Sequence, residues 1–351
     1  MVAEYSAGRV VIFGLGGTIA MSTAPSGGVA PSLTADALVA AVPGLAESGI
    51  DVEVVQFRQL PGASLTFHDI QELCAVMVLR AESATGFVVT QGTDTIEETS
   101  YLIDLLHALD HPVVVTGAMR NPTMAGADGP ANLLAAINLA ADQVARGLGC
   151  LVVLDDQIHA ASRVRKQHST STGTFGSLDG GPLGYVVEGK PRLVNTVRRP
   201  GTVPTKLIGV QRVPIFTAAL GDGVYLLRAM ASQIDGLVVA AMGVGHVPAV
   251  MVDALAELAA EVPVVLSSRT GSGPVLRSTY GFPGSERDLI SRGLIPAGFL
   301  NPLKARILLS SALSSGVDID TIRQAFAVAG GDGNAKWPWA RALDEEDDAR
   351  S

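Results

Sequence analysis

Short runs of apolar residues alternate with longer amphipathic segments along the first half of the chain. The runs are rich in Val, Ile and Phe and predict strands, whereas the segments between them repeat apolar residues at helical spacing. Continuous apolar strands separated by helices are typical of a parallel sheet that is covered on both faces. The predicted strands are 9–15, 51–57, 86–91, 112–117 and 150–154, and the predicted helices are 34–45, 66–81, 95–109 and 132–146.

The alternation stops after residue 155 and resumes near residue 213. Residues 157–180 are rich in Ser, Thr and Gly and predict an irregular excursion from the sheet, and residues 190–212 carry four Arg, two Lys and three Pro. The second alternation predicts strands at 213–218, 236–241 and 262–266 and helices at 249–260, 302–314 and 321–329. We therefore expect an α/β protein with a larger N-terminal parallel-sheet domain (1–190), a linker (191–212) and a smaller C-terminal α/β domain (213–351).

The longest apolar stretch without charges, 236–252, is close to the length of a membrane span but contains Gly243, Gly245, His246 and Pro248. These residues favour a strand, a loop and a helix start over a membrane helix. The N-terminal residues lack the basic region and the long apolar core of a signal peptide. We therefore expect a cytoplasmic protein with no membrane partner.

Composition and charge narrow the classes of partner. Hydrophobic residues make up 48% and charged residues 17% of the 351 residues, which is typical of a globular protein with a well-buried core. The net charge of −9 and the short basic cluster at 163–166 argue against a nucleic acid partner, because phosphate contacts need a basic surface. Cys74 and Cys150 are too few for a disulfide framework or a cysteine-built zinc site, and their apolar surroundings predict buried free thiols.

The segment 88–106, VVTQGTDTIEETSYLIDLL, runs from a predicted strand into a predicted helix through four residues that begin with Gly92. Thr95 and Glu98 fit a capping box, in which both side chains bind free amides at the helix start. Thr93 and Asp94 are not needed for capping. They follow the carboxyl end of a predicted parallel strand, where α/β proteins place their ligands, and they are candidate functional residues.

A second strand-to-helix crossover, GLGGTIA at 14–20, places Thr18 directly after Gly16 and Gly17. The two glycines allow the backbone to turn tightly. A dinucleotide fingerprint is the alternative, but Ile19 stands where G-x-G-x-x-G needs its third glycine, and the chain has no Walker motif. The crossover instead presents a hydroxyl group at the end of another predicted parallel strand.

A threonine hydroxyl becomes a nucleophile only when a base removes its proton. His68, His107 and His111 fall in predicted helices or at a helix end, and no G-x-S-x-G elbow occurs. A lysine can serve as the base when its surroundings lower its pKa from the reference value of about 10.4. Lys166 lies in the polar excursion beside the last strand of the first sheet, and it is either an ordinary solvated lysine or this base.

The motifs GLGGTIA and GFVVTQGTDTIEET resemble the two signatures of the bacterial-type L-asparaginase family. The resemblance continues through PVVVTGAMRNP, GADGPANLLAA, VVLSSRTGSG and GLIPAGFLNPLKARILL, in order and over almost the whole chain. It implies a larger N-terminal and a smaller C-terminal α/β domain, and a homo-oligomer in which tight dimers pair into tetramers with active sites at the dimer interface. It also implies hydrolysis of the side-chain amide of L-asparagine, often of glutamine too, through a covalent acyl-enzyme and without a metal or a cofactor.

The same resemblance assigns catalytic roles to four residues. Thr18 would be the nucleophile. Thr93, Asp94 and Lys166 would form a second catalytic group, in which the lysine assists Thr93 and Thr93 handles a proton or activates water. Asp94 would also pair with the α-ammonium group of the substrate.

The substrate-binding positions that the resemblance implies include departures from the family pattern. The backbone near Ala118 would hold the amide oxygen, and Glu286 would reach the α-ammonium group of a substrate bound to the neighbouring subunit. Gly62 and Ala63 fall where the family commonly uses a serine and its neighbour to bind the substrate carboxylate. A lost hydrogen bond to a charged group costs about 1.5–3 kcal/mol, although Ser64 or backbone amides could replace it.

Two further departures concern the lid and the adjacent site. The family has a tyrosine on a mobile lid after the first threonine, but this chain has no tyrosine between Tyr5 and Tyr101. The matching segment, MSTAPSGGVAP at 21–31, still predicts a mobile loop from its Gly and Ser content. His246 stands where the family often has an asparagine that contacts the adjacent site.

Three alternatives to an asparaginase stay open at this point. The departure at Gly62 and Ala63 motivates a related amide hydrolase whose substrate lacks an ordinary α-carboxylate. An amidotransferase subunit that supplies ammonia to a tRNA partner shares the signatures, but it would be expected to carry an extra N-terminal domain, and here the first motif begins at Gly14. The absence of the lid tyrosine motivates a non-catalytic amino-acid-binding protein.

Overall fold

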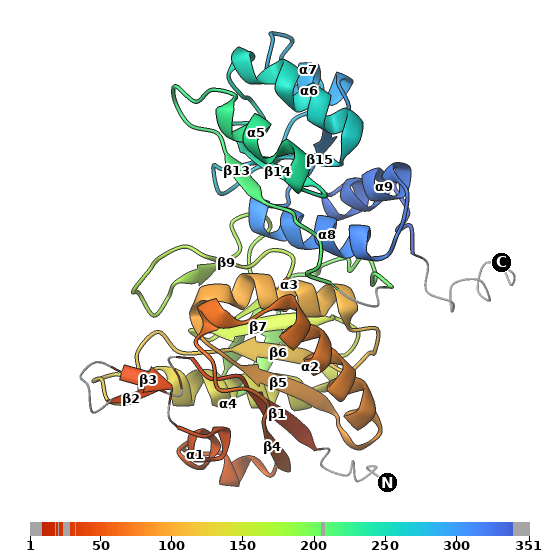
Figure 1. The fold of residues 1–351 in the computed structure, drawn as a ribbon. Helices are drawn as coiled ribbons and strands as arrows, with labels where there is room; N and C mark the ends of the chain where they lie inside the picture. Colours follow the sequence, from red (N-terminus) through yellow and green to blue (C-terminus); the bar gives the residue numbers. More distant parts are fainter. Residues whose placement is uncertain are drawn as a thin grey trace, which may run out of the picture. The chain divides into compact units, whose positions relative to one another are not determined.

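The computed structural model describes residues 9–17, 19, 21–23, 29–31, 33–204 and 208–339, and it divides the chain into two compact units, Met1–Arg199 and Pro200–Ser351 (Figure 1). Both units are α/β, as the alternating pattern predicts. The predicted strands and helices of both halves occur within a few residues of their expected ends, and the differences lie in the segments between them.

The first unit is built on a sheet whose described strands follow the order β12-β11-β8-β7-β6-β5-β1-β4. The strands β4, β1, β5, β6 and β7 run parallel, which confirms the predicted parallel core. Their bounds are β1 Val10–Gly14, β4 Val52–Gln56, β5 Gly86–Thr90, β6 Val113–Thr116 and β7 Cys150–Leu154. The antiparallel edge consists of β8 Gln157–Ala160, β11 Gly184–Val187 and β12 Lys190–Leu193.

The expected irregular excursion at 157–180 is therefore wrong at its start, where β8 continues the sheet. Asp155 and Asp156 adopt φ angles of 52° and 58°, and this left-handed pair turns the chain back so that β8 pairs antiparallel with β7. Asp and Asn tolerate the left-handed region better than most residues. Farther on, β9 Arg165–Lys166 and β10 Phe175–Gly176 pair only with each other among the described strands and form a small ribbon outside the main sheet.

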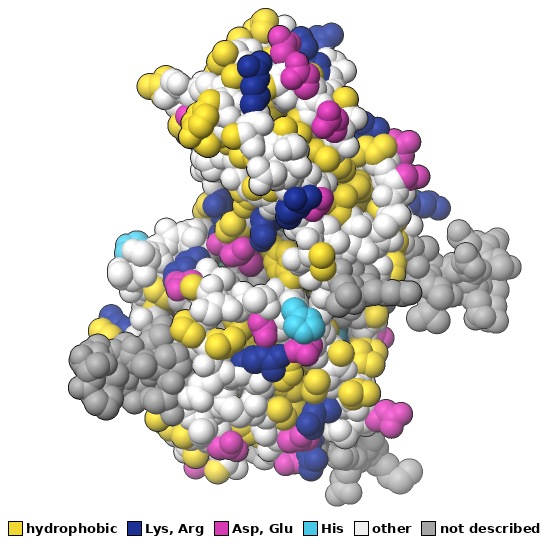
Figure 2. Space-filling view, in the orientation of Figure 1, with side chains coloured by type: hydrophobic (Ala, Val, Ile, Leu, Met, Phe, Trp, Pro, Cys, Tyr) yellow, Lys and Arg dark blue, Asp and Glu magenta, His cyan; other side chains and the backbone are white. Residues whose placement is uncertain are grey.

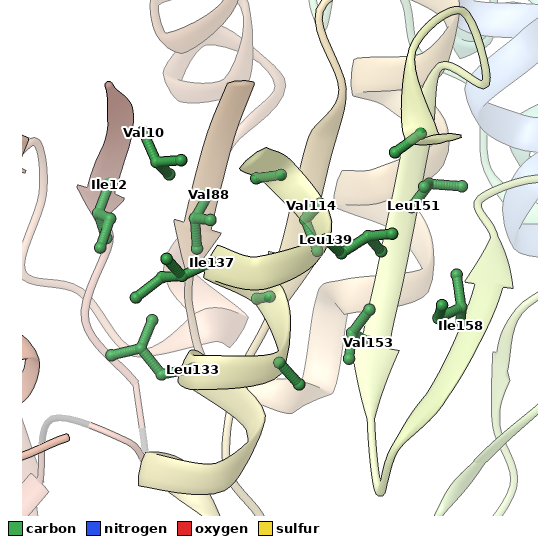
Figure 3. Packing of buried hydrophobic residues seen from close by; sticks show 14 of the residues in the cluster. Val10, Ile12, Val88, Val114, Leu133, Ile137, Leu139, Leu151, Val153 and Ile158 are labelled. Carbon is green, nitrogen blue, oxygen red and sulfur yellow. The ribbon is translucent and has the colours of Figure 1, made fainter. Parts of the chain in front are cut away.

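Helices cover both faces of this sheet (Figure 1). The helices α1 Ala35–Ala40 and α4 Gly129–Ala141 pack on one face, and α2 Phe67–Arg80 and α3 Ile96–Leu106 pack on the other. Figure 3 shows the first interface, where Leu133 and Ile137 of α4 lie against alternate residues of the strands, such as Val88 and Val114. Because alternate strand residues face opposite sides, strands that are apolar throughout supply core residues to both layers.

The end of the first unit is fixed by a buried ion pair. Arg199 lies 3.0 Å from the carboxylate of Asp104 on α3 and also donates to the carbonyl oxygens of Asp104 and His107. Both side chains are about 10% exposed or less. The segment 191–212, which the sequence predicts as a linker, therefore starts inside β12. Its residues up to Arg199 belong to the first unit.

The second unit has a parallel sheet of described strands in the order β13-β14-β15-β16. The bounds are β13 Ile215–Thr217, β14 Leu237–Ala241, β15 Val264–Ser268 and β16 Ile295–Pro296. The helices α5 Tyr225–Met230, α6 Val252–Glu261 and α7 Glu286–Ser291 pack around one core with the sheet. The helices α8 Pro302–Ser314 and α9 Ile319–Ala329 pack against each other and against sheet strands.

The apolar stretch 236–252 forms β14, a loop and the start of α6, which confirms its interpretation as strand, loop and helix start. Across the described helices, none is long and apolar enough to cross a membrane. On the face shown in Figure 2, acidic and basic side chains are interspersed and do not gather into a patch of one sign. Cys74 and Cys150 are buried and free, as predicted, and burial raises the pKa of the Cys74 thiol to about 12.

Candidate active site

Four chain crossovers meet at the carboxyl ends of neighbouring parallel strands of the first unit. Gly14 at the end of β1 lies opposite Thr90 of β5 on one side and Gln56 of β4 on the other. Thr90 in turn lies opposite Thr116 at the end of β6. The segments that follow these strands therefore start at the same edge of the sheet, which is where α/β proteins bind ligands.

Glycines let three of these crossovers touch through their backbones. A Cβ atom on Gly17 would lie 2.0 Å from the backbone nitrogen of Gly92, and one on Gly62 would lie 2.9 Å from the carbonyl oxygen of Gly92. Gly17 also has a φ angle of 87°, which residues with a Cβ rarely adopt. These contacts leave no room for side chains, so the loops after β1, β4 and β5 form one compact backbone layer.

Thr93, Asp94 and Lys166 come together, although Lys166 lies far from the other two in the sequence. The Nζ atom of Lys166 lies 2.9 Å from Thr93 Oγ1 and 2.8 Å from Asp94 Oδ1. Thr93 is buried, whereas the side chain of Asp94 is 70% exposed and that of Lys166 is 16% exposed. The three side chains thus form a continuous hydrogen-bonded chain from a buried hydroxyl to an exposed carboxylate.

The predicted capping box at Thr95 is wrong. Thr95 precedes α3, but its side chain makes no capping hydrogen bond to the helix. Its hydroxyl instead donates to the Gly62 carbonyl at 3.1 Å and accepts from Gln91 Nε2 at 3.2 Å. Residues 93–95 form a 3₁₀ turn before the helix, so the local backbone no longer places Thr95 as a standard cap. Thr95 therefore connects two crossovers, a role that the local sequence pattern does not reveal.

The loop that carries Ala118 follows β6, and two polar side chains form hydrogen bonds with its backbone. Asp128 accepts the backbone amides of Met119 and Arg120 at 3.0 and 2.8 Å, and Asn132 Nδ2 donates to the Gly117 carbonyl at 3.0 Å. A Cβ atom on Gly117 would lie 3.3 Å from the Cγ2 atom of Thr93. The start of the Ala118 loop thus lies beside Thr93.

Thr18 lies outside the described residues, but both of its neighbours in the sequence are described. Gly17 contacts the Gly92 backbone, as noted above, and the buried side chain of Ile19 packs with the buried side chain of Ala118. The chain on either side of position 18 is therefore tied to the crossover before Thr93 and to the loop of Ala118.

Gly62 and Ala63 lie in the 3₁₀ turn η3 Gly62–Ser64, which follows β4 and joins the same cluster of crossovers. Gly62 is buried against Gly92, while Ala63 and Ser64 are exposed. Within the predicted mobile loop at 21–31, β2 Met21–Thr23 and β3 Val29–Pro31 pair as an antiparallel ribbon, and residues 24–28 lie outside the described part of the chain.

Glu286 belongs to the second unit, where it begins α7 and is fully buried. Its Oε1 atom accepts the backbone amides of Thr279 and Tyr280 at 2.9 and 2.8 Å, and its Oε2 atom lies 3.2 Å from His246 Nε2. Since an ionised carboxylate only accepts hydrogen bonds, His246 carries its proton on Nε2 in this pair. The rings of Tyr280 and Phe282 each pack against the His246 ring in a T-shaped arrangement, at centroid distances of 4.9 and 5.0 Å.

These contacts make Glu286 a source of pH-dependent stability. Burial alone raises the pKa of Glu286, but the hydrogen bonds from Tyr280, Thr279 and His246, together with that from its own amide, outweigh it and lower the pKa below the ordinary value of 4.5. A lowered folded-state pKa adds stability above the unfolded-state pKa and loses it as the pH falls through the folded-state value. We expect the free energy of unfolding to fall less steeply between pH 5 and 3 in Glu286→Gln than in wild type.

Urea unfolding midpoints at several pH values measure this effect. Glu257→Gln is the control, because Glu257 is an exposed glutamate on α6 of the same unit. Equal pH slopes for wild type and Glu286→Gln would show that the Glu286 carboxylate is not held as described.

Comparisons with known proteins identify the family of the chain. Residues 9–199 match the family model "Asparaginase, N-terminal", and residues 212–326 match "Glutaminase/Asparaginase C-terminal domain". The chain is 36% identical to the "Probable L-asparaginase" of Deinococcus radiodurans over 91% of this chain and 97% of that protein. It is 35% identical to the "Probable L-asparaginase periplasmic" of Haemophilus influenzae over 91% of this chain and 92% of that protein.

A solved structure shows the same fold. The crystal structure of the "Probable Cytoplasmic L-asparaginase" from Campylobacter jejuni superposes with a TM-score of 0.81 at 34% sequence identity, and the match covers 91% of this chain and 99% of the other. Two family models together span most of the chain, and the relatives match over nearly their full length. The chain is therefore a member of the asparaginase family and an amidohydrolase.

Proposed function

We propose that this enzyme hydrolyses the side-chain amide of L-asparagine to give L-aspartate and ammonia, with Thr18 as the nucleophile. The observation that carries the proposal is the hydrogen-bonded chain of Thr93, Lys166 and Asp94 at the strand ends of the first unit. This chain lies at the crossover whose Gly92 contacts Gly17, the residue before Thr18. Two hydroxyls, one amine and one carboxylate supply the groups that acyl transfer to a threonine requires.

In the first half of the reaction, the Thr18 hydroxyl oxygen attacks the amide carbon of the substrate. A carbon–oxygen bond forms, the proton that the Thr18 hydroxyl loses is transferred to the amide nitrogen, and the carbon–nitrogen bond breaks so that the nitrogen leaves as ammonia. The oxygen of the tetrahedral intermediate carries negative charge, which the backbone near Ala118 would stabilise. Asp128 and Asn132 hold the loop of Ala118 in place, so its backbone needs little reorganisation during the reaction.

In the second half, water attacks the acyl-enzyme and releases L-aspartate with regeneration of the Thr18 hydroxyl. Thr93 Oγ1, which accepts a hydrogen bond from Lys166 Nζ at 2.9 Å, orients the water. The proton that the water loses ends on the Thr18 oxygen as the bond from that oxygen to the acyl carbon breaks. Asp94 balances the positive charge on Lys166 through its contact at 2.8 Å. Because the carboxylate of Asp94 is also largely exposed, it is able to bind the α-ammonium group of the substrate.

The remaining substrate contacts are assigned by position. Gly62 and Ala63 offer backbone groups at the loop after β4 for the substrate carboxylate, with the exposed Ser64 beside them. Glu286 would face the α-ammonium group at a site in a neighbouring subunit of a dimer or tetramer. Because its carboxylate is buried in the single subunit, this contact requires the residues around Glu286 to rearrange on assembly. We further propose a cytoplasmic location and a reaction that uses no metal or cofactor.

A substrate panel tests the proposed specificity. The purified enzyme is assayed for ammonia release from L-asparagine, L-glutamine, D-asparagine and small amides that lack an α-carboxylate. The proposal predicts the highest kcat/KM for L-asparagine. A preference for the amides without a carboxylate would instead favour a related amide hydrolase, which the Gly62 and Ala63 positions motivate. Binding of asparagine in calorimetry without ammonia release would favour an amino-acid-binding protein.

A further inference from the structure

We infer that Glu97 is a positioning residue that holds Lys166 in reach of Thr93. This inference rests on the proposed function of Lys166 and extends it to a residue outside the four catalytic positions. Glu97 is the second residue of α3, three positions after Asp94, and its side chain is only 8% exposed. The observation behind the inference is that this buried carboxylate contacts the short strand that carries Lys166.

Lys166 does not belong to the main sheet. It lies on the two-residue strand β9, whose described partner is β10, where Phe175 pairs with Lys166 and Gly176 with Arg165. One end of the ribbon is tied to the sheet, because the amide of the buried Val164 donates to the Ala160 carbonyl of β8 at 3.0 Å. That bond does not itself fix the Lys166 backbone relative to the helix that follows Thr93, whose Oγ1 atom lies 2.9 Å from Lys166 Nζ.

Glu97 connects the Lys166 backbone to the helix that starts beside Thr93. Its Oε1 atom accepts the backbone N–H of Lys166 at 3.4 Å, and its Oε2 atom lies 4.0 Å from Arg165 Nε. Both residues of β9 are thus attached to one carboxylate. Because Thr93 and Asp94 precede the same helix, Glu97 fixes the lysine relative to the two groups that the lysine must reach.

The charge of Glu97 favours this role over simple packing. Burial of a carboxylate is costly unless it is paired and hydrogen-bonded, so an apolar side chain would pack here at lower cost. The start of a helix favours a negative charge, which reduces that cost at the second helical position. A displacement of about 1 Å at a reacting group can lower a rate about 100-fold, so loss of this contact should reduce catalysis.

Kinetics of Glu97→Met and Glu97→Gln test the inference. Methionine fills the space without accepting the amide, and we expect its kcat for ammonia release to fall about 10- to 100-fold with KM changed less than about threefold. Glutamine still accepts the Lys166 amide, so its kcat should stay within about threefold of wild type. If Glu97→Met does not fold, Glu97→Ala replaces it.

A double variant separates positioning from a structural role. If Glu97 acts only through Lys166, adding Glu97→Met to Lys166→Ala should lower kcat by less than about twofold, because coupled residues are not additive. Asp104→Asn is the matched control, since Asp104 is another buried carboxylate of α3 that accepts a backbone amide, that of Cys150, and pairs with an arginine. The control should leave kcat near that of wild type, which would show that loss of a buried carboxylate of α3 does not by itself slow the reaction.

Crystal structures of wild type and Glu97→Met provide a readout that does not depend on activity. The inference predicts that the distance from Lys166 Nζ to Thr93 Oγ1 lengthens beyond hydrogen-bond reach in the variant. An unchanged distance together with a wild-type kcat would overturn the inference. Absence of amide hydrolysis in wild type would overturn the proposed function instead, while the crystallographic comparison would still decide whether Glu97 positions the lysine.

Discussion

Replacement of Thr93 by alanine is expected to lower kcat for amide hydrolysis by about 10²–10⁴-fold, the usual contribution of a positioned proton-transfer group. The Thr93 hydroxyl is the buried end of the chain that runs through Lys166 to Asp94, and its removal takes away the group that orients the attacking water. The measurement is ammonia release under saturating substrate, with folding checked by circular dichroism.

Thr93→Ser is the matched control for this result, because serine keeps the hydroxyl group and loses only the methyl group. The Cγ2 atom of Thr93 lies near Gly117, so the serine variant is expected to lose some packing but most of its activity should remain. A Thr93→Ala enzyme that works at the wild-type rate would remove Thr93 from the mechanism.

Replacement of Gly17 by alanine is expected to lower the free energy of unfolding by about 3–5 kcal/mol. The φ angle of 87° is strained for alanine, and the added Cβ atom would lie 2.0 Å from the backbone of Gly92. The strain and the clash each cost about 1–3 kcal/mol, and backbone cannot move aside as a side chain would.

Gly49→Ala separates the two causes in the same unit. Gly49 has a φ angle of 68°, but a Cβ atom there would meet nothing within 4 Å. Alanine at this position should therefore cost only about 1–2 kcal/mol from backbone strain. Urea unfolding of both variants gives the comparison. Equal losses of unfolding free energy at the two positions would contradict the close contact between Gly17, after β1, and Gly92, after β5.

The parallel core of the fold was predictable because its strands are continuous apolar runs. Strands such as β5 and β7 are buried over their whole length, and their sequences show it directly. The strand β8 was missed because QIHA is short and stands in a segment rich in Ser, Thr and Gly. Its place in the sheet depends on the left-handed turn at Asp155 and Asp156, which hydrophobic periodicity does not reveal.

Three of the predicted catalytic residues lie together, but the connections around them were less predictable. Thr93, Asp94 and Lys166 were identified from motifs, and the structure brings them within hydrogen-bond distance. The contact of Glu97 with β9 was not predictable, because it joins segments far apart in the sequence. The nearest signal was the pair of adjacent glutamates, Glu97 and Glu98, at the start of a helix. The sequence pattern assigns Glu98 to a capping box with Thr95, and that capping box does not form.

The Thr95 error has a similar origin. The pattern of a threonine followed by a glutamate three residues later normally marks a capping box. Here the glycine contacts between the crossovers bring the Gly62 carbonyl to the Thr95 hydroxyl, and this tertiary hydrogen bond replaces the local one. Local patterns fail where backbone segments from separate loops touch, which in this protein is the candidate active site.

The central claim, threonine-dependent hydrolysis of asparagine, is tested most directly by one assay. Ammonia release from L-asparagine and L-glutamine is measured for the purified wild-type enzyme beside Thr18→Ala under identical conditions. The proposed mechanism predicts rapid release from L-asparagine by wild type and its loss in the variant, with the fold unchanged. Full activity of Thr18→Ala would contradict the nucleophile, and the absence of release from either amino acid by a well-folded wild type would contradict the substrate.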